Sequence, residues 1–278
     1  MKSKVTIAFL LAIGAVFYLS FNGVSTTDNT SAETTEAEKT SVQVADEEYC
    51  HPRYEKQQPS SEQILHRMAY TTSYNKDTRC PNWVGWALTR EHTDGDNERS
   101  NHKFLEDKEV PEPRAVYSDI RESECGYQRG HLCPAADNKW SFKAQNEAFL
   151  MTNICPQDGH LNQRAWKYLE EQCRDWAVKY GKVFIVAGPL FNTSKPKTVG
   201  EHHVAVPDAF FKVVMAFDDE GKARAIGFCY NNAPERGTTK DYARSVDEIE
   251  SMTGLDFFYQ LDDETENRIE AECDFDKW

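Results

Sequence analysis

Positive charge is scarce in this chain of 278 residues. Lysine and arginine together number 32, against 46 aspartates and glutamates, so the formal net charge is −14 at pH 7. Proteins that coat nucleic acid gain affinity from many lysine and arginine contacts to phosphate, and the acidic balance argues against that class. It does not exclude an enzyme with a local cationic cleft and a metal ion, because the local potential governs a site.

Closely spaced cysteine pairs are also missing. The chain has eight cysteines, and the closest two, Cys125 and Cys133, are eight residues apart. Structural zinc sites usually show cysteine pairs separated by only a few residues, so this pattern argues against structural zinc. An even number of cysteines behind an export signal instead favours disulfides in an oxidising compartment, with a connectivity that the spacing leaves open.

A long apolar run occurs at the N-terminus. Lys2 and Lys4 precede 17 residues, Val5 to Phe21, that are almost wholly apolar. This pattern predicts a signal peptide over residues 1–25, and the alternative is an uncleaved membrane anchor through residues 5–21. We therefore expect an exported protein that is secreted, periplasmic or membrane-anchored with its domain outside the cytoplasm.

The segment that follows, residues 26–48, lacks aromatic side chains and is rich in Thr, Ser, Glu and Ala. Such a composition buries too little apolar surface to fold, which predicts a disordered acidic linker. No internal repeat or further linker follows, so residues 49–278 are expected to form one domain.

The hydrophobic pattern of that domain mixes strands with a few helices. It predicts strands over 83–92, 182–191, 203–219 and 222–232, and one helix over 161–181 that ends at Gly181. A second helix is expected over 245–254, with Ser245 and Glu248 as a capping box. Strands and helices without regular alternation indicate an α+β fold with a largely antiparallel sheet.

Three polar residues in this domain carry the chemistry of a metal-dependent hydrolase. His131 can take a proton from water, and the carbonyl of Asn162 is a hard oxygen ligand that suits Mg²⁺. Arg129 can hold a phosphate oxygen. Each residue alone is also compatible with a structural role, but together they favour metal-assisted phosphodiester hydrolysis. Glu170, eight residues after Asn162, is expected to reach the metal through water.

The stretches RGHLCPAADNKWS (129–141) and FLMTNICPQDGHLNQRAWKYLE (149–170) resemble the DNA/RNA non-specific endonuclease family of ββα-metal nucleases. The resemblance covers most of the chain after about residue 59. It implies a ββα-metal nuclease fold, with a central, mostly antiparallel sheet flanked by helices. It also implies DNA and RNA as substrates, with little preference for either sugar.

The same resemblance implies roles for single residues. His131 corresponds to the general base and Asn162 to the ligand of Mg²⁺, for which Mn²⁺ is an alternative. Arg129 corresponds to the arginine near the scissile phosphate, and Glu170 to a water-mediated metal contact. Arg99, in a segment that aligns loosely, is the candidate for an upstream arginine that helps the transition state.

One departure from the family pattern is Gln128, where the family commonly has aspartate before Arg-Gly-His. Glutamine can replace the carboxylate if its task is hydrogen bonding, but not if its charge tunes the site.

Two disulfides are candidates among the eight cysteines. Cys133–Cys155 would join the two strands of the site, and Cys229–Cys273 would hold the C-terminal tail.

Two alternative functions are also compatible with the sequence. One is a secreted, disulfide-stabilised nucleic-acid-binding or interaction module without catalysis, and the other is a phosphodiesterase for a different ester. The sequence leaves the oligomeric state open.

Overall fold

The computed structural model describes residues 46–278. The predicted signal peptide and residues 26–45 of the predicted linker lie outside the described residues. Asp46–Cys50, at the end of that linker, forms a 3-10 helix. Within 46–278, no helix is both long and apolar enough to span a bilayer.

The centre of the fold is a seven-stranded sheet in the order β12-β11-β10-β7-β4-β3-β2, with antiparallel pairing throughout. Its strands are β2 (Glu62–His66), β3 (Thr71–Asn75), β4 (Cys80–Thr89), β7 (Lys182–Leu190), β10 (Ala209–Phe217), β11 (Ala223–Asn231) and β12 (Ala243–Arg244). The predicted α+β class with an antiparallel sheet is confirmed. The predicted strand over 203–219 is two strands, because Pro207 lacks the N–H that a continuous ladder needs.

Within residues 46–278, three two-stranded sheets and six α-helices accompany the central sheet. The small sheets pair β1 (Arg53–Tyr54) with β13 (Leu255–Asp256), β5 (Gln128–His131) with β6 (Ile154–Gln157), and β8 (Thr198–Val199) with β9 (Val204–Ala205). The helices are α1 (Glu122–Cys125), α2 (Phe142–Ala148), α3 (Gly159–Gln163), α4 (Ala165–Tyr180), α5 (Val246–Thr253) and α6 (Asp263–Ala271).

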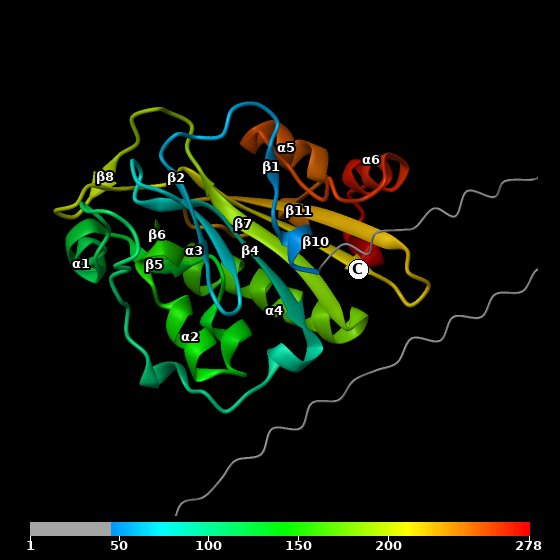
Figure 1. Ribbon diagram of the computed structural model, residues 1–278, viewed down its shortest axis with the longest axis horizontal. Helices are drawn as coiled ribbons and strands as arrows, with labels where there is room; N and C mark the ends of the chain where they lie inside the picture. Colours follow the sequence, from blue (N-terminus) through cyan, green and yellow to red (C-terminus); the bar gives the residue numbers. More distant parts are fainter. Residues whose placement is uncertain (1–45) are drawn as a thin grey trace, which may run out of the picture. The chain divides into compact units, whose positions relative to one another are not determined.

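The sheet separates two hydrophobic cores. Successive side chains of a strand point to opposite faces, so on β10 Phe210 and Val214 join one core while Phe211 and Val213 join the other. Helix α4 covers the first core, and α5 and α6 cover the second (Figure 1). The capping box predicted for α5 is confirmed, since Ser245 and Glu248 cap each other's backbone.

Helix α4 belongs to a unit of two strands and helices, β5, β6, α3 and α4. The single helix predicted over 161–181 is wrong: α3 ends at Gln163 and α4 begins at Ala165, and Arg164 between them has a φ of −128° and a ψ of −91°, which are not helical. Asp158 caps α3 by accepting hydrogen bonds from the backbone N–H groups of His160 and Leu161. The break places Asn162 on α3 and Glu170 on α4.

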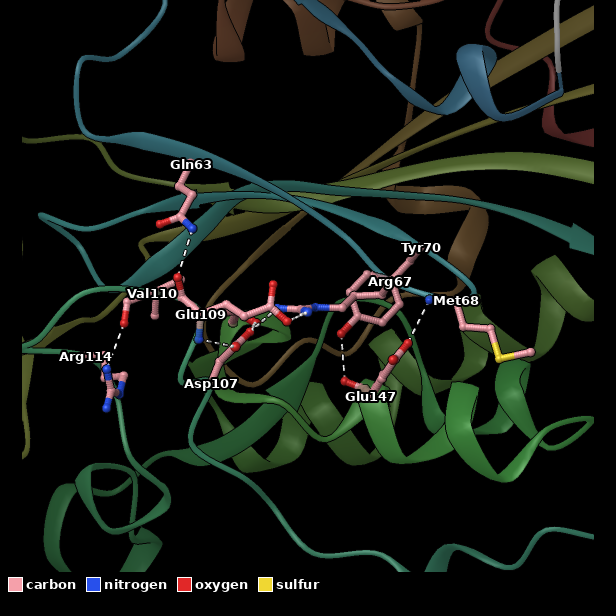
Figure 2. A network of polar contacts seen from close by, with 10 residues as sticks. Gln63, Arg67, Met68, Tyr70, Asp107, Glu109, Val110, Arg114 and Glu147 are labelled. Carbon is pink, nitrogen blue, oxygen red and sulfur yellow. Dashed lines mark hydrogen bonds and ion pairs between the residues drawn. The ribbon is translucent and has the colours of Figure 1, made fainter.

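A polar network fixes the long connection between β4 and β5 (Figure 2). Arg67, between β2 and β3, forms ion pairs with Asp107 at 2.5 Å and Glu109 at 2.6 Å. Nearby, Tyr70 donates its hydroxyl to the backbone oxygen of Glu147 at 2.7 Å. Because Asp107 is buried, its pairing ties this connection to the edge of the sheet.

The two predicted disulfides are not formed. The free thiols include Cys133, Cys155, Cys229 and Cys273. The register of β5 and β6 pairs Cys155 with Gly130, so Cys133 lies beyond the end of this pairing. The Cys133 sulfur instead accepts a hydrogen bond from Asn138 at 3.4 Å.

Candidate active site

A cavity of about 560 Å³ opens over the β5, β6, α3 and α4 unit. Four of the predicted site residues line it: Arg99, His131, Asn162 and Glu170. The other lining residues are Gln128, Pro134, Ala135, Ala136, Gln163, Lys167 and Arg174. The cavity therefore gathers one histidine, one carboxylate, three amides and three cations.

His131 ends β5 with its ring buried at the inner wall of this cavity. The side chain is 6 % exposed, and its Nε2 has no hydrogen-bond partner. The rings of Phe149 and Phe104 pack against it, with centroids 5.0 and 5.3 Å away. Burial, followed by the charge of Arg99, lowers the pKa of His131 to about 3. The imidazole is therefore neutral at physiological pH and can accept a proton.

The glycine before His131 is required by packing. A Cβ on Gly130 would lie 2.2 Å from Oε1 of Gln157, on the partner strand β6. Gln157 is itself fully buried, so it has little room to move. Glycine at this position lets the two strands approach closely enough to set His131 against the cavity.

Asn162 is held by a chain of amide hydrogen bonds. Its Nδ2 donates to Oε1 of Gln128 at 3.0 Å, and Nε2 of Gln128 donates to both carboxylate oxygens of Glu122 at 3.0 Å. Because Gln128 takes the amide N–H of Asn162, the amide oxygen is turned away from Gln128. Gln128 thus supplies the acceptor that an aspartate would have supplied.

Glu170 lies on α4 and lines the same cavity. Burial raises the pKa of Glu170 to about 7, against the opposing charge of the Lys212 ammonium. Asp137 raises the pKa further, whereas Arg174 and Arg99 lower it. The carboxyl group is therefore poised to ionise near neutral pH, where a nearby cation would favour the charged form.

The two arginines have different surroundings. The guanidinium of Arg99 lines the cavity and lies over the Phe149 ring at 5.3 Å. Arg129 does not line the cavity: its guanidinium donates to the backbone oxygens of Tyr117 and Ile120, at 3.0 and 2.8 Å. It also lies 4.7 Å from the ring centroid of Phe104, which contacts His131. In this arrangement Arg129 supports the wall behind the histidine.

Sequence reasoning missed several cations around Glu170. Lys167 and Arg174 line the cavity, and their positions three residues before and four after Glu170 are a helical signal that could have revealed them. Arg174 pairs with the buried Asp137 at 2.8 Å. Beneath α4, Lys212 is 0 % exposed, and its Nζ lies over the rings of Trp166 and Trp86 at 4.5 and 5.3 Å.

The donor atoms in this cavity fit a hard divalent cation. Asn162 offers a neutral amide oxygen and Glu170 a carboxylate. Oxygen donors of this kind suit Mg²⁺ and Mn²⁺, and Mg²⁺ keeps most of its waters with one or two protein ligands. The volume of the cavity leaves room for a hydrated ion and a phosphate.

Comparisons with known proteins identify the family of this chain and support its fold. The family model of the DNA/RNA non-specific endonucleases matches residues 51–264. Mitochondrial endonuclease G of Bos taurus is 36% identical over 211 residues, which are 72% of this chain and 70% of that protein. A nuclease of Nostoc sp. is 33% identical over 220 residues, which are 76% of this chain and 78% of that protein.

A solved structure, titled as the EndoG/EndoGI complex, supports the fold. Its matching chain gives a TM-score of 0.68 with 24% sequence identity, over 78% of this chain and 91% of that chain. With a family match that spans residues 51–264, the chain belongs to the DNA/RNA non-specific endonuclease family of metal-dependent nucleases and is an endonuclease.

Proposed function

We propose that this endonuclease is exported and that it uses Mg²⁺ to hydrolyse phosphodiester bonds in both DNA and RNA, with His131 as general base and Asn162 as metal ligand. The observation that carries the proposal is the unpaired Nε2 of a buried, neutral His131 in the wall of a cavity that Asn162 also lines. Because this imidazole is neutral and its Nε2 has no hydrogen-bond partner, that nitrogen is available to accept a proton.

Each side chain has a defined task in this mechanism. His131 accepts a proton from the attacking water at Nε2. Arg99 lies beside the phosphate and offsets the charge that grows in the transition state. Asn162 would hold the ion through its amide oxygen, and Glu170 would accept a hydrogen bond from the water around it. When bound, Mg²⁺ polarises the phosphoryl oxygen and stabilises the leaving oxygen.

The cavity gives little basis for choosing a sugar or a base. The cations and amides in its lining suit phosphate oxygens, and phosphate contacts position a strand without reading its sequence. Cleavage of both DNA and RNA follows from such contacts. The non-catalytic alternative depended on Gln128, which keeps the acceptor needed by Asn162.

Cleavage of plasmid DNA and of RNA, with Mg²⁺ and then with excess EDTA, tests this function. We expect both substrates to be cut with Mg²⁺, and neither with EDTA. His131→Ala should lower kcat by at least about 100-fold, the usual range for a lost general base. The matched control is His160→Ala, an exposed histidine on α3 outside the cavity lining, which should cut at the normal rate. Full activity of His131→Ala would overturn the mechanism.

Export has its own test. The support for it is the basic, apolar start of the sequence at residues 1–25. Expression of the full chain in a bacterial host should yield nuclease outside the cytoplasm, whereas a chain that begins at residue 46 should stay inside. Equal distribution of the two forms would contradict export.

A further inference from the structure

A second group of carboxylates lies between α5 and α6, on the face of the sheet opposite to α4 (Figure 1). Asp247 and Glu250 are one helical turn apart on α5, and Glu270 is near the end of α6. One carboxylate oxygen from each of the three lies within 4.8 Å of the others. None of these residues lines the nuclease cavity.

Glu270 is the unusual member of this group. It is 6 % exposed, and its Oε1 has no hydrogen-bond partner. Buried carboxylate oxygens are normally paired, because an unpaired one loses its hydration without compensation. The carboxylates of Asp247 and Glu250 are its neighbours, each with an oxygen within 4.8 Å of an oxygen of Glu270. Such an arrangement points to a positive ligand.

The neighbouring oxygens are held in place by the protein. Oε1 of Glu250 accepts a hydrogen bond from the backbone N–H of Phe257 at 2.8 Å. Ile249 and Ile269, which precede Glu250 and Glu270 in the chain, are buried in the shared core and fix the two helices against the sheet. The packing of α5 and α6 therefore fixes the backbone positions from which the three carboxylates extend.

The surrounding charge is also negative. Burial, then the Glu250 charge, raises the pKa of Glu270 to about 9, and burial raises the pKa of Glu250 to about 7. The other charged groups that act on these two carboxyls are Asp247, Asp256, Glu266 and Glu55. The adjacent cation, Arg53, is already paired with Asp256 at 2.7 Å. A bound cation would relieve this repulsion.

We propose that Asp247, Glu250 and Glu270 form a Ca²⁺-binding site that clamps α5 to α6. The donors are all carboxylate oxygens, which favours a hard cation over zinc or copper. Three oxygens within 4.8 Å of one another lie at most about 2.8 Å from a common centre, so small movements of the side chains bring all three to a Ca–O distance of about 2.4 Å. Mg²⁺ requires shorter bonds in a stricter octahedron. Asp247 is exposed and leaves a route for entry.

Thermal unfolding and calorimetric titration of the full chain with CaCl₂ at pH 7.5 test this site, without any use of nuclease activity. We expect Ca²⁺ at about tenfold above its Kd to raise Tm by about 2–4 °C. Glu270→Gln, which keeps the side-chain volume, and Asp247→Asn, at an exposed position, should each fold normally and weaken Ca²⁺ binding at least about 10-fold.

Two controls separate this site from other sources of the same signal. Glu264→Gln changes an exposed carboxylate on the same helix, and Asn162→Ala removes the ligand in the nuclease cavity. Both variants should keep the full rise in Tm with Ca²⁺. In Asn162→Ala, where the ligand in the nuclease cavity is absent, Mg²⁺ at equal concentration should give a smaller rise than Ca²⁺. The proposal fails if wild-type protein gives no rise with Ca²⁺, if Glu270→Gln keeps it, if Asn162→Ala abolishes it, or if Mg²⁺ matches Ca²⁺ in Asn162→Ala.

Discussion

Nδ2 of Asn162 donates to Oε1 of Gln128 at 3.0 Å, so the residue that departs from the family pattern sets the orientation of the Asn162 amide. Gln128 differs from aspartate in also donating to Glu122, which completes the chain of hydrogen bonds. In this chain the position therefore accepts the Asn162 amide N–H through a neutral side chain.

Removal of this acceptor should weaken metal binding more than chemistry. In Gln128→Leu, Asn162 loses its partner, and we expect the Mg²⁺ concentration for half-maximal cleavage to rise by about 10- to 100-fold. At saturating Mg²⁺, kcat should stay within a few-fold of wild type. Titration of plasmid cleavage with Mg²⁺ measures both quantities. An unchanged Mg²⁺ requirement would show that Gln128 does not orient the ligand.

Glu170 should make the metal-free protein less stable as pH rises. Its pKa is about 7 in the folded state against 4.5 unperturbed, so its stabilising contribution is present below pH 4.5 and is lost as pH rises through about 7. Glu170→Gln removes this loss. We expect it to gain about 2 kcal/mol of unfolding free energy over wild type at pH 8, and little at pH 4.5.

Urea unfolding in EDTA at the two pH values checks this prediction. The matched control is Glu171→Gln, which removes the neighbouring carboxylate that pairs with Lys167 at 3.5 Å near the surface. That variant should differ little from wild type at either pH, because exposed ion pairs contribute little. An equal response of the two variants would count against a buried, titrating Glu170.

Truncation of Arg99 should affect catalysis, whereas truncation of Arg129 should affect stability. Arg99 faces the cavity, and Arg99→Ala should lower kcat by about 100-fold with little change in Tm. Arg129→Ala removes two bonds to backbone oxygens and a ring contact, so we expect unfolding free energy to fall by about 2 kcal/mol. Steady-state kinetics measure kcat, and thermal melts measure the stability of both variants. The reverse pattern would exchange the two roles.

Lys212 should control the acid limb of the pH–rate profile from beneath α4. Its ammonium lowers the pKa of Glu170, so Lys212→Met should raise that pKa. Since the carboxylate form is needed near the ion, the acid limb should move to higher pH by about one unit. Lys240→Met, at a surface pair with Asp276, is the matched control and should leave the profile unchanged. A profile unchanged in Lys212→Met would contradict the coupling.

The residues that lie on the cavity were largely predictable, because His131, Asn162 and Glu170 occur in a motif with fixed spacing. The sheet was predictable for a similar reason, since its long strands are continuous apolar runs. The features that the sequence did not reveal lack a local signal. Arg164 interrupts the helix with no glycine or proline to mark it. The placement of Arg129 behind Phe104 depends on the path of the long connection between β4 and β5, which the sequence pattern does not predict.

The surroundings of Lys212 were also not predictable from the sequence. It is a cation within a buried strand, which sequence reasoning takes as part of a hydrophobic run. What stabilises it there, two tryptophan rings and the carboxylates of α4 and its surroundings, comes from three distant segments. Such a partner set emerges only when β10 and α4 are packed together.

The break at Arg164 changes how the spacing between Asn162 and Glu170 is to be understood. In one continuous helix, an inserted residue would rotate everything before it by about 100° and carry the ligand out of the cavity. Here an irregular turn joins two separate helices, and each end is anchored by its own contacts. A change of length at this turn can be absorbed locally. The eight-residue interval between Asn162 and Glu170 therefore depends on the geometry of the turn at Arg164 and not on the pitch of one helix.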